Sequence, residues 1–136
     1  MDASESPILI DAPEGRGEFD KDMLERMGHR VMMCEGPDED ALCPILKEDG
    51  DCEMVDAAHG VVFELDLSRA QHRDILWRYQ QVIRPGVPIR AVVLPGQEHI
   101  YADLLVGAEV WTREPNVAEL DGFSARVEAY ERQLED

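Results

Sequence analysis

Three evenly spaced cysteines are the residues of this sequence best suited to chemistry. Cys34, Cys43 and Cys52 follow a C-x8-C-x8-C pattern. Three thiolates can hold Zn²⁺ or an iron–sulfur cluster with one further ligand, although this spacing is neither a CxxC zinc motif nor a ferredoxin pattern. The same thiols could instead remain free and buried, or two of them could form a redox disulfide. The candidate fourth ligands for zinc are His29, His59 and His72.

The surroundings of these cysteines are strongly acidic. Residues 34–56 contain nine carboxylates and a single cation, Lys47. Negative neighbours raise the pKa of a thiol, which argues against a reactive cysteine more than against a metal ligand, because a bound cation would be attracted. A metal would also give this Pro- and Gly-containing segment a reason to be ordered. We interpret residues 34–56 as a cysteine-containing acidic loop insertion.

Two aspartates, Asp11 and Asp66, come directly after apolar runs and are the other candidates for chemistry. The sequence offers few other candidate catalytic or phosphate-binding sites. No Ser/His/Asp nucleophile set is recognisable, and residues 15–17 lack the full phosphate-loop pattern. A flavin phosphate is disfavoured because residues 11–14 read Asp-Ala-Pro-Glu, which would repel it.

The elements that would position these residues alternate between strands and helices. A run that is apolar at successive positions indicates a buried parallel strand, and apolar residues three or four apart indicate a helix. Such alternation predicts a doubly wound, five-stranded parallel α/β sandwich, receiver-like or flavodoxin-like in order, with functional groups at the carboxyl ends of the strands. The expected strands cover 7–11, 31–33, 61–67, 88–94 and 110–111, and the expected helices cover 19–27, 75–83, 100–105 and 117–130.

Length and charge narrow the function further. The chain has 136 residues, which suits one domain over 1–136 with a loose N-terminus at 1–6, and its formal charge is −17. This charge disfavours nucleic acids and anionic membranes as partners. No stretch approaches the roughly 20 apolar residues of a membrane helix, and the acidic start does not look like a secretory signal. With an odd number of cysteines, we expect a cytoplasmic protein.

The segment 107–115 resembles a known family. Its sequence, Gly-Ala-Glu-Val-Trp-Thr-Arg-Glu-Pro, is similar to the Gly-Ala-acid-x-aromatic-x-x-Lys-Pro run of receiver domains in two-component response regulators. The Val-Pro-Ile at 87–89 also matches the usual lead into the fourth strand of that family. The resemblance implies that Asp66 occupies the phospho-acceptor position, that Asp11 occupies the Mg²⁺-binding position, and that Trp111 is the aromatic switch residue.

Three departures from the receiver pattern affect the phosphoryl chemistry. Glu114 stands where receivers have the lysine that stabilises the phosphoryl oxygens, so it would repel them. Residues 93–95 (Val-Leu-Pro) lack the usual hydroxyl, and Ala12 replaces the second acidic residue. Arg113, next to Glu114, could replace the lysine only with a bulge in the strand. The sequence therefore resembles a pseudo-receiver whose phospho-acceptor site is vestigial.

These patterns predict a non-catalytic signalling and protein-interaction module rather than an enzyme. In receivers the fourth helix, fifth strand and fifth helix form the partner-binding face, which here predicts an interaction face at Tyr101, Trp111 and Phe123. The expected partner is another protein or a second copy through the last helix, and no cofactor is the leading expectation. The alternatives are a zinc or iron–sulfur sensor that uses the three cysteines, and a response regulator phosphorylated on Asp66.

Overall fold

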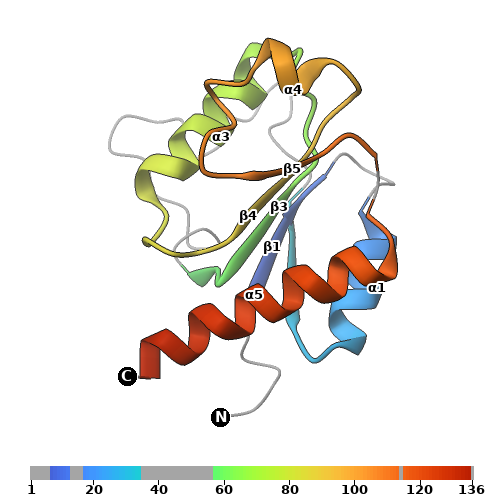
Figure 1. Ribbon diagram of the computed structural model, residues 1–136, viewed down its shortest axis with the longest axis vertical. Coiled ribbons are helices and arrows are strands. Elements are labelled where there is room, and N and C mark those ends of the chain that lie inside the picture. The colour runs from blue at the N-terminus through green and yellow to red at the C-terminus, as the bar shows by residue number, and fades with distance from the viewer. Residues whose placement is uncertain (1–6, 13–16, 35–56, 114, 136) are drawn as a thin grey trace.

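A five-stranded, all-parallel sheet forms the centre of the fold (Figure 1). The computed structural model describes residues 7–12, 17–34, 57–113 and 115–135. The sheet order is β2-β1-β3-β4-β5, which confirms the predicted fold class and is consistent with receiver-like and flavodoxin-like proteins. The strands are β1 (Pro7–Asp11), β2 (Arg30–Cys34), β3 (Gly60–Phe63), β4 (Ile89–Val92) and β5 (Glu109–Trp111).

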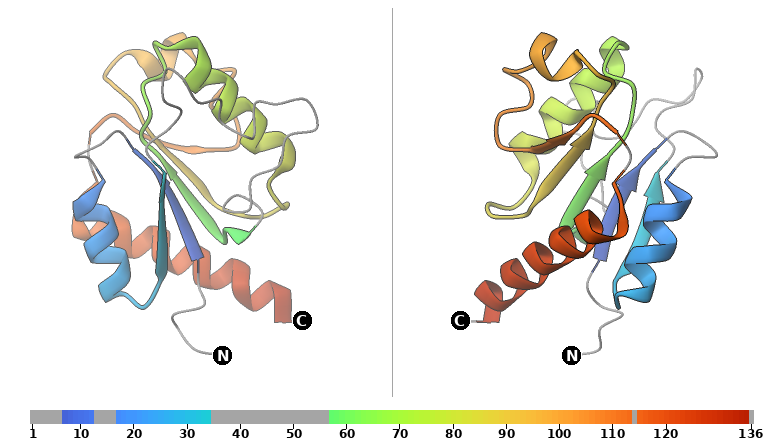
Figure 2. Two further views of the ribbon diagram at one scale, coloured as in Figure 1. Left: turned by 180° about the vertical axis from the view of Figure 1, so that it is seen from behind. Right: turned by 45° about the vertical axis from the view of Figure 1, so that its right-hand side comes forward.

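Helices cover both faces of this sheet (Figures 1 and 2). Two of them, α3 and α4, lie on one face, while α1 and α5 lie on the other. Among the described residues, no helix combines the length and the apolar character needed to span a bilayer. The helices are α1 (Glu18–Arg26), α3 (Ala70–Val82), α4 (Gln97–Ile100) and α5 (Val117–Glu135).

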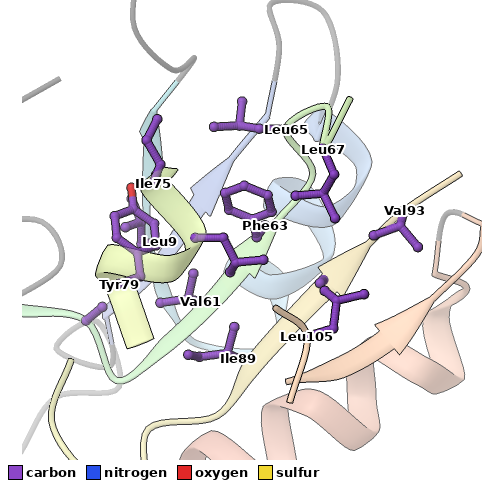
Figure 3. Close-up of a cluster of buried hydrophobic side chains, with 13 residues drawn as sticks. Leu9, Val61, Phe63, Leu65, Leu67, Ile75, Tyr79, Ile89, Val93 and Leu105 are labelled. Carbon is purple, nitrogen blue, oxygen red and sulfur yellow. The ribbon is translucent and has the colours of Figure 1, made fainter. Parts of the chain in front are cut away.

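Each face of the sheet packs its own hydrophobic core. Every residue of β3 is buried, because alternate side chains of a central parallel strand enter opposite layers. Figure 3 shows the larger cluster, in which Phe63 and Leu9 meet Ile75 and Tyr79 of α3. The smaller cluster lies under α1 and α5 and is formed by Ile8, Ile10, Ala12, Leu24, Val62, Leu120, Phe123 and Val127.

Helix α5 packs especially closely against the start of β3. A Cβ atom added at Gly60 would lie 2.7 Å from Cγ2 of Val127 and 3.1 Å from Cζ of Phe123. Real Cβ atoms do not approach a neighbour that closely, so only glycine allows the helix to lie at this distance from the strand.

Two expected elements are shorter than the sequence indicated. β3 ends at Phe63 rather than at residue 67, because the chain leaves the ladder there while Leu65 and Leu67 still turn into the core. The expectation that Asp66 closes this strand was therefore wrong. The helix expected over 100–105 was also misplaced: α4 is a single turn at 97–100, and turns follow it. The other expected strands and helices are confirmed within a few residues.

Candidate functional site

Asp11 ends β1 as a completely buried acid. It pairs in register with Cys34 of β2 and Phe63 of β3, and its side chain has no exposed surface. Burial raises the pKa of this carboxyl to about 6, and the Tyr79 hydroxyl and the Cys34 thiol oppose the rise in part. Neither carboxyl oxygen has a partner in good hydrogen-bonding geometry among the described residues. Asp11 is therefore a buried acid at the end of β1, and its neutral form is favoured relative to an exposed carboxyl.

Asp66 lies in different surroundings, on the exposed loop between β3 and α3. Its Oδ1 accepts a hydrogen bond of 2.9 Å from the Ser68 main-chain N–H, and that bond is the first cause of its lowered pKa. Its main-chain oxygen accepts bonds from the Arg69 N–H, at 3.1 Å, and from Nδ1 of His72, also at 3.1 Å. These contacts stabilise the turn that starts α3. Asp66 thus has a local structural role in the loop.

The two described members of the predicted vestigial phospho-acceptor site, Asp11 and Asp66, lie in different surroundings. Asp11 is buried and Asp66 is exposed, and no hydrogen bond joins the two. The third predicted member, Glu114, lies outside the described residues. Arg113, the candidate replacement for the receiver lysine, donates to Oε1 of Glu119 at 2.5 Å.

Sequence reasoning missed a second buried carboxylate at this edge of the sheet. Glu64 follows the last residue of β3 and is only 5% exposed. Its main-chain N–H donates to the Asp11 carbonyl oxygen at 2.7 Å, which places Glu64 directly beside the end of β1. The available signal was the position of Glu64 in the run 61–67, but that run was interpreted as a longer strand with Asp66 at its end.

Of the three predicted metal-ligating cysteines, the structure places only Cys34. It ends β2, is partly buried, and its carbonyl oxygen accepts the Ala12 N–H at 2.9 Å. Cys43 and Cys52 lie outside the described residues, as does the rest of the predicted insertion over 35–56. Within the described ranges, no three His, Cys, Asp or Glu side chains are grouped so that they could hold a metal ion.

The candidate histidine ligands each have another contact. His59 Nδ1 lies 2.7 Å from Oε2 of Glu131, which links the segment before β3 to the end of α5. His29 Nε2 lies 2.5 Å from Oγ of Ser124, in a buried contact between the turn after α1 and helix α5. A serine–histidine pair is also the core of many hydrolases, but both side chains are at most 5% exposed. The hydroxyl could not meet a substrate there, so the pair links the turn between α1 and β2 to α5.

The predicted interaction face is divided between the two sides of the sheet. Phe123 is 1% exposed and belongs to the core under α5, because it shares the buried helix face with Leu120 and Val127. Tyr101 packs against the opposite core, where the Arg73 guanidinium lies 5.4 Å from its ring centre. Trp111 lies in β5, on the α5 side. The three aromatic residues therefore do not form one exposed surface.

Trp111 is held in place by a buried arginine that sequence reasoning also missed. The Arg90 guanidinium carbon lies 3.0 Å from the centre of the Trp111 ring, and the side chain is 1% exposed. Its Nη2 lies 2.7 Å from Oε2 of Glu109, and its Nη1 donates to the Glu119 carbonyl oxygen at 2.9 Å. Arg126 pairs with the same Glu109 carboxylate. A charged residue inside the apolar run 88–94 was the signal for a buried cation with an acidic partner.

The chain matches no protein-family model and no curated protein. The resemblance to receiver domains therefore depends on residues 107–115 and 87–89, and the sheet order is consistent with it.

Proposed function

We propose that this chain is a non-catalytic, receiver-like interaction module, which signals through contact with a protein partner and does not accept a phosphoryl group. The observation that carries the proposal is the difference in burial between the two aspartates. A receiver needs its acidic residues to share one exposed cluster, in which oxygen atoms surround a magnesium ion. Here Asp11 is enclosed by the sheet and α3, whereas the Asp66 carboxylate is exposed and bonded to its own loop.

The electrostatic surroundings favour the same proposal. Phosphorylation would add about −1.5 to −2 charge. Glu64 and Asp11 lie at the adjacent strand ends, and Glu119 holds the Arg113 guanidinium. Additional negative charge would therefore lie near these carboxylates, and Glu114 stands at the sequence position of the lysine that stabilises such charge in receivers.

Incubation of the full chain with acetyl phosphate and MgCl₂, followed by intact-mass measurement, tests the proposal. We expect no increase in mass under conditions in which a competent response regulator is fully labelled. The matched variants are Asp66→Asn and Asp11→Asn. A phosphoryl adduct on the wild-type chain that disappears in either variant would replace this proposal with a phosphorylated response regulator.

The cysteine-based alternative is tested on the same preparation. Elemental analysis and a visible spectrum of anaerobically purified protein measure bound zinc and iron directly. Bound zinc, or a cluster absorption, that is lost in Cys34→Ser would favour a metal sensor over the proposed interaction module.

A further inference from the structure

The outward side of α3 carries a large exposed aromatic residue. Ala70, Asp74, Trp77 and Gln81 are all exposed and recur every three to four residues, so they form one stripe along the helix. Trp77 leaves 54% of its surface in solvent. The fold does not need it for packing, because Ile75, Leu76 and Tyr79 already fill the core side of the helix. Exposed tryptophan is typical of the centre of a protein–protein interface.

Two contacts fix the turns after α4 beside this stripe. The Arg73 guanidinium lies over the Tyr101 ring, and Nε2 of Gln80 donates to the Leu104 carbonyl oxygen at 2.8 Å. Arg73 lies four residues before Trp77, and Gln80 lies three residues after it. Residues at this spacing share one face of a helix, so the two contacts lie next to Trp77, one before it and one after it along the helix. Figure 1 shows α3 and α4 side by side. Two strongly exposed apolar residues lie here, Ile100 at the end of α4, with 72% exposed, and Val106 in the turns after it, with 70% exposed.

The distribution of formal charge along the chain indicates which molecule could bind this surface. The chain carries −17, so two copies repel each other wherever carboxylates would meet. Segments 69–84 and 97–107 together hold four arginines and three carboxylates, a formal +1, while the rest of the chain carries −18. These two segments therefore add no net negative charge of their own to the repulsion between two copies. By contrast, α5 holds five carboxylates and two arginines, which makes the predicted dimer through the last helix less favourable.

We propose that the Trp77 stripe of α3, with the adjacent turns after α4, is the surface through which two copies of this chain form a two-fold symmetric dimer. This inference deepens the proposed function, because it names the partner of the interaction module. In an antiparallel crossing at Trp77, Asp74 of one copy lies opposite Gln81 of the second copy, and the two Trp77 rings meet at the axis. No charge on the stripe then faces a charge of the same sign, so the surface is complementary to itself.

Sedimentation equilibrium of the full chain tests the dimer and its surface. Because Trp77 is exposed, Trp77→Ala should fold normally, which far-UV circular dichroism checks, and it should weaken dimerisation by about 30-fold or more. Phe19→Ala is the matched control: Phe19 is an aromatic residue on α1, 47% exposed, on the other face of the sheet. The control should change the dissociation constant by less than about twofold, as a residue outside the interface does.

Two substitutions at Gln81 test the crossing itself. Gln81→Glu would face Asp74 with a second carboxylate, and Gln81→Lys would face it with a cation. They should shift the dissociation constant in opposite directions, each by roughly threefold because symmetry repeats the pair. Raising NaCl from about 0.05 M to about 0.5 M should tighten the dimer, since salt screens the repulsion between two chains of charge −17.

The outcomes separate this inference from the proposed function. A wild-type chain that remains monomeric at high concentration and high salt overturns the dimer. A dimer that Trp77→Ala does not weaken, or that responds equally to both Gln81 substitutions, also overturns it. In either case the proposed function stands if acetyl phosphate leaves no adduct. A phosphoryl adduct overturns the proposed function, whatever the oligomeric state.

Discussion

Replacing Asp11 with asparagine should stabilise this protein at neutral pH. The Asp11 carboxyl is fully buried at the end of β1, where neither oxygen has a well-placed donor among the described residues. Asparagine has nearly the same shape but cannot ionise, so the substitution removes a buried negative charge while it keeps the packing against Tyr79 and Cys34.

The size and sign of the effect follow from the pKa. Burial raises the pKa of Asp11 from 3.8 to about 6 in the folded chain. Each pKa unit corresponds to about 1.4 kcal/mol, so the folded state loses up to about 3 kcal/mol relative to the unfolded state when Asp11 ionises. The folded state binds the proton more tightly, so this loss is absent below pH 3.8, grows as the pH rises to about 6, and is complete above that.

Urea denaturation of both proteins across a pH series measures this effect. The free energy of unfolding of Asp11→Asn minus that of the wild type should increase by about 3 kcal/mol between roughly pH 3 and pH 8. The other carboxylates are common to both chains and cancel in this difference. A difference that does not vary with pH, or that falls as the pH rises, would refute the assignment of Asp11 as a buried, destabilising acid.

Three further substitutions test other parts of the structure. Asp66→Asn should do the opposite of Asp11→Asn: its lowered pKa gives stability that is present at neutral pH and lost in acid, so the variant should be less stable near pH 7, and equal urea midpoints there would contradict this. Gly60→Ala forces a Cβ against Val127 and should lower the free energy of unfolding by about 1–3 kcal/mol, which unchanged urea curves would disprove. Arg90→Ala should lower it by about 2 kcal/mol and shift the tryptophan emission to longer wavelength, whereas an unshifted spectrum would count against the stacking on Trp111.

Hydrophobic pattern predicted the architecture well because the sheet is central and parallel. Buried strands such as β1 and β3 read as continuous apolar runs, and the buried face of α5 repeats every three to four residues. The same rule misplaced the end of β3. Leu65 and Leu67 are as buried as strand residues, but they reach the core from a loop, and composition does not distinguish these two routes.

The candidate site was harder to predict because it depends on which side chains meet. The spacing of residues shows that Tyr101 and Trp111 come from neighbouring elements, but not that they lie on opposite faces of the sheet. Phe123 has the helical spacing of a core residue and is one, although the resemblance to receivers assigned it to a surface. The exposure of Trp77 depends on how α3 docks, which no local pattern specifies.

The shortness of β5 limits how these molecules can aggregate. Strand β5 lies at one edge of the sheet and has only three residues. The Glu109 carboxylate at its start pairs with Arg90 and Arg126. A long, uncharged edge strand exposes unpaired main-chain N–H and C=O groups. A strand of another molecule can pair with these groups, and repeated pairing of this kind leads to fibrils. Because β5 is a three-residue edge strand that begins with a charged residue, it offers few main-chain groups for such pairing. The sheet should therefore resist extension at β5 even in crowded solution.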